Sequence, residues 1–216
     1  MNTLRLAALL LLLPLAPLVA QEVNVELMAS VMAAEDARSF DEELLRSALA
    51  NPDSSIRNFA ALSAGRLRDS RTIPLLVPLL RDRDSLVQTT AFFAMGLIGD
   101  TSAARLLVAR ARDAVPVSQP GALELITALA HIGGGTSAGF LREVLTGSVF
   151  NSRVDQPYLM ARAAVESWRL GRLAPVNELT GLAGDPKLEI RLGAIYSLGR
   201  LRAKGAGSRM LDALQD

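Results

Sequence analysis

The chain repeats one sequence pattern at a nearly constant interval, and this repeat constrains its fold more than any other feature. Residues 59–69 read FAALSAGRLRD, residues 90–100 read TAFFAMGLIGD and residues 193–203 read GAIYSLGRLRA. The first two copies align at a shift of 31 residues, which places Gly65 on Gly96. A fixed period of about 30 residues predicts a row of stacked supersecondary units.

Each repeat is predicted to contain two helices, because its apolar residues recur at helical spacing. In the first clear copy Ile56 and Ala60 lie on one face of a helix that Asp53 is placed to cap. Thr72 is expected to cap a second helix, with Pro74 in its first turn. Half of the chain is apolar but only 4% is aromatic, so the core must consist of Leu, Ala, Val and Ile. This composition favours helix over sheet.

A glycine recurs inside the first predicted helix of the clear copies, at Gly65, Gly96 and Gly199. Glycine within a helix costs about 1 kcal/mol relative to alanine. Its recurrence therefore indicates a steric need, and we expect that a side chain there would separate the two helices of a unit.

The pattern resembles the HEAT repeat family, in particular the short bacterial HEAT-like repeats of the phycobilin-lyase type. The shared signature is an Ile/Val-Arg start, an Ala pair, a Leu-Gly or Met-Gly step, an Asp turn, Pro-x-Leu and a Leu-Leu pair. It is clear over 51–113 and 185–201 and weaker over 118–183. The resemblance implies an all-α fold, a right-handed α-solenoid of about five to six two-helix repeats, and it carries no catalytic residues.

The same resemblance implies a partner for the arginine near the start of the first helix, which is Arg57 or Arg191 in the copies that keep it. In the family such an arginine pairs with an acidic turn residue of a neighbouring unit. The residues that could play this part are Asp53, Asp84 and Asp185.

Residues 1–20 have the plan of a secretory signal peptide. Arg5 precedes an apolar run over 6–13, and Ala20 ends the segment before Gln21. The run is short for a membrane span, so contact with a membrane is expected only if this segment is not cleaved. The predicted location is periplasmic or secreted. The predicted HEAT-repeat domain covers 21–216, with units at approximately 22–50, 52–82, 83–114, 116–147, 150–183 and 185–216.

The sequence contains no recognisable catalytic, cofactor or metal motif. His131 is the only histidine and cysteine is absent, so no zinc-ligand spacing exists. The glycine-rich stretch 133–139 lacks the lysine and spacing of a phosphate loop, and 41–43 is explained as the acidic first turn of a helix. With 23 basic and 22 acidic residues, no nucleic-acid partner is indicated. We therefore expect no metal, no cofactor and no enzymatic activity.

Arginine and one tryptophan recur near the predicted ends of first helices and are the candidate partner-binding residues. Cations near a helix C-terminus also stabilise its dipole, and an aromatic residue there can simply fill the core, so a structural role is the alternative. The candidate residues are Arg66, Arg68, Trp168, Arg169, Arg172, Arg200 and Arg202.

Stacked repeats leave an extended surface that binds other macromolecules. The leading hypothesis is an exported scaffold or adaptor that binds protein or peptide partners and has no catalysis of its own. The alternative is the N-terminal HEAT-repeat portion of an exported enzyme, such as a cyclophilin-like peptidyl-prolyl isomerase. The array ends at Asp216 without a polar capping unit, and this motivates the alternative. A lyase for a prosthetic group is a third possibility.

Overall fold

The computed structural model describes residues 16–147, 155–203 and 207, and within these ranges all regular structure is helical. The chain alternates between two sets of helices. The first helices are α1 (Ala16–Asp36), α3 (Ser54–Leu67), α5 (Ser85–Ile98), α7 (Gln119–Ile132), α9 (Gln156–Glu166) and α11 (Leu188–Leu201). The second helices are α2 (Glu42–Leu49), α4 (Ile73–Leu76) with the 3-10 segment η2 (Val77–Arg81), α6 (Thr101–Ala111), α8 (Gly134–Leu145) and α10 (Val176–Leu182). Two further 3-10 segments are η1 (Ser70–Thr72) and η3 (Ser167–Leu173).

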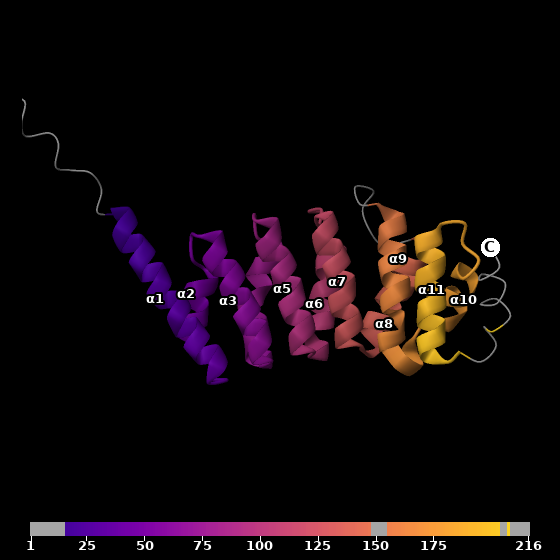
Figure 1. Ribbon diagram of the computed structural model, residues 1–216, viewed down its shortest axis with the longest axis horizontal. Helices are drawn as coiled ribbons and strands as arrows, with labels where there is room; N and C mark the ends of the chain where they lie inside the picture. The colour runs from indigo at the N-terminus through magenta and orange to yellow at the C-terminus, as the bar shows by residue number, and fades with distance from the viewer. Residues whose placement is uncertain (1–15, 148–154, 204–206, 208–216) are drawn as a thin grey trace, which may run out of the picture.

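The helices stack in chain order. The first helices lie side by side, each packed against the first helix before it and the one after it, and the second helices form another row behind them (Figure 1). Neighbouring elements in space are therefore neighbours in sequence, which is the arrangement of a solenoid. The predicted all-α solenoid is confirmed.

Aspartate begins most of the helices in the first half of the array. The Asp53 carboxylate accepts a hydrogen bond from the backbone N–H of Ser55, and Asp84 and Asp100 do the same at α5 and α6. Thr72 occupies the predicted N-cap position of α4, with Pro74 in the first turn, but its side chain makes no capping hydrogen bond, because its hydroxyl donates to the backbone carbonyl of Asp69 at 2.7 Å. The aspartate caps satisfy backbone N–H groups in the first turn that have no partner within the helix.

Glycine allows the first helices of adjacent units to touch. A Cβ at Gly65 would lie 2.6 Å from the Cα of Ala94, and one at Gly96 would lie 2.9 Å from the Cα of Ala128. A side chain at Gly65 would therefore push α3 away from α5, and one at Gly96 would push α5 away from α7. The sequence-based expectation that such a side chain would separate the two helices of one unit is wrong, and Gly199 is exposed.

Arg57 anchors the turn that leads into the next unit. Its Nε and one terminal nitrogen each donate to the Asp82 carboxylate at 2.8 Å, and its other terminal nitrogen donates to the carbonyls of Asn51 and Pro52. The expected partners Asp53 and Asp84 are therefore incorrect. Both carboxylates are used as helix caps, whereas Asp82 faces the guanidinium.

Arg191 repeats only part of the arrangement seen at Arg57. Its guanidinium donates to the backbone carbonyl of Asp185 at 2.8 Å. The expected residue is therefore the partner of Arg191, but the contact uses the main chain and not the carboxylate.

A second arginine is buried within the core. Arg110 of α6 is only 2% exposed and aligns with Leu79 of the preceding unit. Its guanidinium donates to the carbonyls of Leu80 at 2.7 Å and Val115 at 2.9 Å, while its remaining terminal nitrogen has no partner among the described residues. Burial lowers its pKa, and the charge of Asp113 opposes that shift. The unit that contains α6 thus accommodates a buried arginine at the position where the preceding unit has leucine.

The N-terminal segment is described only in part. The predicted signal peptide covers 1–20, of which 1–15 lie outside the described residues. Helix α1 begins at Ala16 and continues past the predicted cleavage point at Ala20. No helix in the described part of the chain is long and apolar enough to cross a membrane.

Candidate functional site

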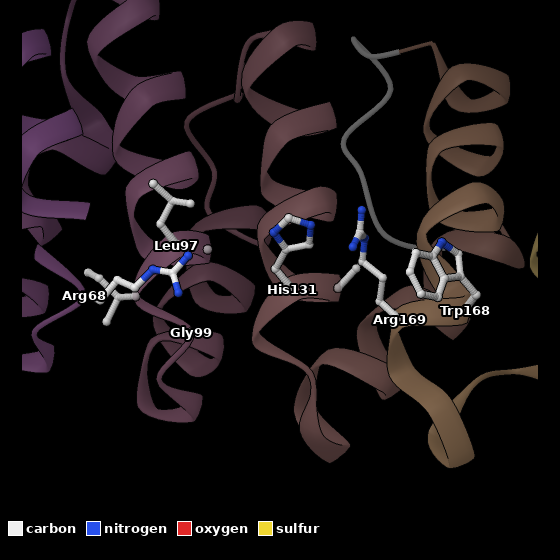
Figure 2. Close-up of a pocket in the computed structure, with 9 residues that line it drawn as sticks. Arg68, Leu97, Gly99, His131, Trp168 and Arg169 are labelled. Carbon is white, nitrogen blue, oxygen red and sulfur yellow. The ribbon is translucent and has the colours of Figure 1, made fainter. Parts of the chain in front are cut away.

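The C-terminal ends of the first helices lie along one edge of the solenoid and line a groove. Arg68 follows α3, Gly99 follows α5, His131 lies in the last turn of α7, and Trp168 and Arg169 follow α9. These residues border a hollow of about 550 Å³ (Figure 2). The His131 imidazole and the Arg169 guanidinium face the space between α7 and α9 in this view. Four consecutive units therefore contribute to a single surface.

A second hollow continues the groove toward the N-terminal end of the array. It shares Arg68 and Leu97 with the first, and α1 adds Glu35 together with the neighbouring Arg38. Arg66 forms an ion pair with Glu35 at 3.3 Å. We call the C-terminal ends of the first helices the arginine edge, with the residues Arg38, Arg66, Arg68, Arg169, Arg200 and Arg202.

Trp168 holds two of these arginines in place. The guanidinium carbon of Arg200 lies 3.8 Å from the centre of the indole ring, and that of Arg169 lies 4.7 Å from it. Arg200 also lies 5.9 Å from the ring centre of Tyr196. Cations over aromatic faces are attracted by about 0.5–1 kcal/mol at exposed sites. The half-buried tryptophan is thus a platform for arginine, neither a core side chain nor a bare apolar anchor.

The structure brings most of the sequence-predicted residues together on this edge. Arg172, Arg200 and Arg202 line neither hollow, but Arg200 lies over Trp168 and Arg202 ends α11, whereas Arg172 follows the non-helical Gly171. Arg38, Leu97 and His131 were missed as groove residues. The repeat alignment could have found Leu97, because it occupies the position of Arg66 shifted by one unit.

Two carboxylates lie beside the groove, between α7 and α9. Glu166 is 8% exposed, and it accepts a hydrogen bond from the Arg169 Nε at 2.7 Å and lies 3.6 Å from Arg162. Burial raises the pKa of Glu124 to about 7, the charge of Glu166 adds to this rise, and Arg162 opposes it. Burial and the charge of Arg169 lower the pKa of His131, against the charge of Glu166. The pKa of His131 is therefore linked to Arg169, which lines the groove.

Glu124→Gln is expected to remove a pH-dependent loss of folding stability. The folded protein holds the Glu124 proton more tightly than the unfolded chain, so folding is penalised as the pH rises from the ordinary value of 4.5 through about 7. The variant should be more stable than the parent by about 2 kcal/mol at about pH 8 and nearly equal at about pH 5. Urea unfolding at both pH values measures this, with the exposed Glu26→Gln as the control. Parallel pH profiles for parent and variant would disprove the assignment.

The described residues contain no group of His, Asp and Glu side chains that could hold a metal ion. His131 stands alone in the groove among arginine and apolar residues. What this arrangement offers is a set of guanidinium donors beside apolar surface, which suits recognition of carboxylates.

The fold defines a class, the all-helical repeat proteins. Residues 42–125 match the family model described as HEAT repeats, so this part of the chain consists of HEAT repeats. No curated protein matches the sequence. A solved structure of human deoxyhypusine hydroxylase in complex with glycerol is similar, at 17% identity and a TM-score of 0.38, over 94% of this chain and 91% of that chain.

The prediction that this chain is not an enzyme is contradicted by that match and is withdrawn. The matching protein is a hydroxylase, and the prediction had only the lack of a familiar motif in a repeat array as its support. At this identity and TM-score no reaction and no residue role is transferred to the chain.

Proposed function

We propose that this HEAT-repeat protein is an exported scaffold that binds a protein or peptide partner along the arginine edge. One observation carries the proposal. Arg68 and Trp168 are one hundred residues apart in sequence, yet they line the same groove. A stacked array that buries its apolar stripes in one core leaves such a surface free for a partner.

The chemistry of the groove supports a protein ligand. Arginine and tryptophan are enriched among residues that dominate protein interfaces. Leu97 and Ile98 add apolar surface between the charged ends. A groove that mixes guanidinium groups with apolar side chains matches a polypeptide, which also carries both kinds of group.

Export is the second part of the proposal, and residues 1–20 support it. Their charged, apolar and small-residue order is that of a cleaved signal, and the absence of cysteine means that no disulfide is needed outside the cell. A protein processed in this way would begin at Gln21.

Site-specific cross-linking in intact bacteria tests both parts together. Benzoylphenylalanine at position 66, an exposed residue of the arginine edge, is expected to cross-link a discrete protein in the periplasmic fraction, and the recovered chain should begin at Gln21. The matched control is the same group at position 105, an exposed residue of the second helix α6. Equal cross-linking at the two positions would refute the edge as the binding surface, and recovery only from the cytoplasm would refute export.

A further inference from the structure

Three residues of the arginine edge adopt a backbone conformation that normally belongs to glycine. Arg38, Arg68 and Arg202 have φ angles of 48°, 55° and 51°, and they are the only non-glycine residues with positive φ in the described chain. Each lies just beyond the end of a first helix, namely α1, α3 or α11. After α5 and α7 the corresponding positions are Gly99 and Gly133, both with φ of 72°.

Local backbone energetics therefore do not explain arginine at these positions. A Cβ in the left-handed region is strained, which is why glycine is the usual residue after a helix end. Arginine there gains some interaction with the helix dipole, but a cation elsewhere in the last turn would gain the same without strain. Arg66 and Arg200 already occupy the last turns of α3 and α11.

Three arginines in the row of second helices are paired with a carboxylate of the following unit, although Arg105 on α6 has no such partner among the described residues. Arg81 pairs with Asp113, Arg112 with Glu143 at 2.7 Å, and Arg142 with Glu178 at 3.0 Å, so each is neutralised by the following unit. The side chains of Arg38, Arg68 and Arg202, by contrast, have no hydrogen-bond or ion-pair partner in the described part of the chain. Their charges are therefore not neutralised within the described residues and are accessible to a ligand.

The C-terminal end of the edge adds two more guanidinium groups in fixed positions. Trp168 lies beneath Arg200 and Arg169, and Arg200 also lies near the Tyr196 hydroxyl, at 3.4 Å. Of these two arginines only Arg169 has a carboxylate partner among the described residues, Glu166. Ordering the guanidinium groups in advance reduces the entropy lost when a ligand binds.

Apolar residues occupy the middle of the groove. Leu97 and Ile98 separate Arg38 and Arg68 at one end from Arg169 at the other. Along the array the groove therefore carries arginines with Glu35 and Asp36 beside them, then apolar residues, then Arg169.

We propose that the groove binds an extended acidic segment of a partner protein, with Asp and Glu side chains at both ends and an apolar residue between them. The inference rests on the proposed scaffold function and names the chemistry of its ligand. Guanidinium groups bind carboxylates through paired hydrogen bonds, which accounts for arginine at these positions. Glu35 and Asp36 line the same groove and would repel the continuous phosphates of a nucleic acid, whereas a peptide can place its carboxylates selectively.

Fluorescence anisotropy with defined probes tests the inference. The ligand is a labelled peptide of about 12 residues with Glu at both ends and Leu in the middle, long enough when extended to cross several units. The controls are the same peptide with every Glu replaced by Gln and a single-stranded oligonucleotide of equal charge. The purified protein should bind the Glu peptide at least about tenfold more tightly than either control.

Glycine substitution separates binding from folding in this experiment. The double variant Arg38→Gly/Arg68→Gly removes two arginines that line the groove and places there the residue that the fold uses at Gly99, so its melting temperature should be equal to or above that of the parent. Its affinity for the Glu peptide should fall about tenfold, while Arg105→Ala on α6 should leave the affinity unchanged.

Three results would overturn the inference: equal binding of the Gln peptide, tighter binding of the oligonucleotide, or unchanged affinity in the double variant. The scaffold function is judged separately by cross-linking at position 66. If the double variant keeps that cross-link and the Glu peptide does not bind, the scaffold stands and the acidic ligand is excluded. If the cross-link is absent from the parent protein as well, the scaffold fails.

Discussion

Gly65→Ala is expected to destabilise the protein by about 3 kcal/mol, the upper range for overpacking a core. The added Cβ would lie 2.6 Å from the Cα and 2.8 Å from the Cβ of Ala94, so relief requires α3 and α5 to move apart. Helix packing on both sides of Gly65 resists that movement. For a chain of this length the loss corresponds to a fall of roughly 10 °C in Tm, which circular dichroism would record.

Gly139→Ala is the matched control for this prediction. Gly139 lies within α8, and a Cβ there would meet no atom within 4 Å. Replacing an unconstrained helical glycine with alanine is expected to stabilise the protein by up to about 1 kcal/mol. Opposite effects at Gly65 and Gly139 would establish that the first glycine is required by close approach of helices. Similar Tm values for both variants would refute this account of the packing.

Asp82→Ala is expected to cost about 3–5 kcal/mol, because it leaves a buried guanidinium without its counter-charge. The Arg57 and Asp82 side chains are only 8% and 9% exposed, and the two 2.8 Å hydrogen bonds hold the pair in a bidentate geometry. The Arg57 side chain cannot easily rotate into solvent, since it also donates hydrogen bonds to the carbonyls of Asn51 and Pro52. Urea unfolding of the purified variant measures the loss.

An exposed ion pair provides the comparison for Asp82→Ala. Arg46 and Glu42 are 64% and 58% exposed, so Arg46→Ala should change stability by less than about 0.5 kcal/mol. A cost below about 1 kcal/mol for Asp82→Ala would show that the pair does not anchor the turn.

The Arg57–Asp82 pair should also fail in acid. Burial raises the pKa of Asp82, but hydrogen bonds from Arg57 and from the backbone of Asp84 outweigh burial and leave the pKa lowered from 3.8. The folded protein therefore binds this proton less tightly than the unfolded chain. The stability that the pair contributes is present above the ordinary value of 3.8 and is lost as the pH falls through the lower folded pKa.

Much of the fold follows from the sequence by itself. The 31-residue shift and the helical spacing of apolar residues predict paired helices in a row, because no single pair can bury its apolar stripe alone. The same regularity places Arg66, Arg68, Arg200 and Arg202 at the ends of first helices. Residues at equivalent positions of a repeat must lie along one edge, so the arginine edge was foreseeable.

Side-chain partners and contacts between units were decided only by the tertiary structure. The family resemblance offered Asp53 and Asp84 as partners of Arg57, but both cap helices, and Asp82 at the end of the same unit binds the guanidinium. Gly65 was assigned to the wrong pair of helices for a similar reason. Which residues meet across a boundary depends on the rotation and spacing between successive units, and a pattern within one unit contains neither.

Trp168 and Arg110 make the same point for single side chains. The repeat pattern places Trp168 near the end of a first helix and Arg110 on a second helix. Nothing in the pattern distinguishes the role of either residue from that of the residue at the same position in other units. Only packing against α11 brings Arg200 over the indole, and only the junction with the preceding unit offers Arg110 the Leu80 carbonyl. The sequence by itself determined the repeat and its edges. The tertiary structure decided the partners, because contacts between units depend on distances in space that sequence spacing does not specify.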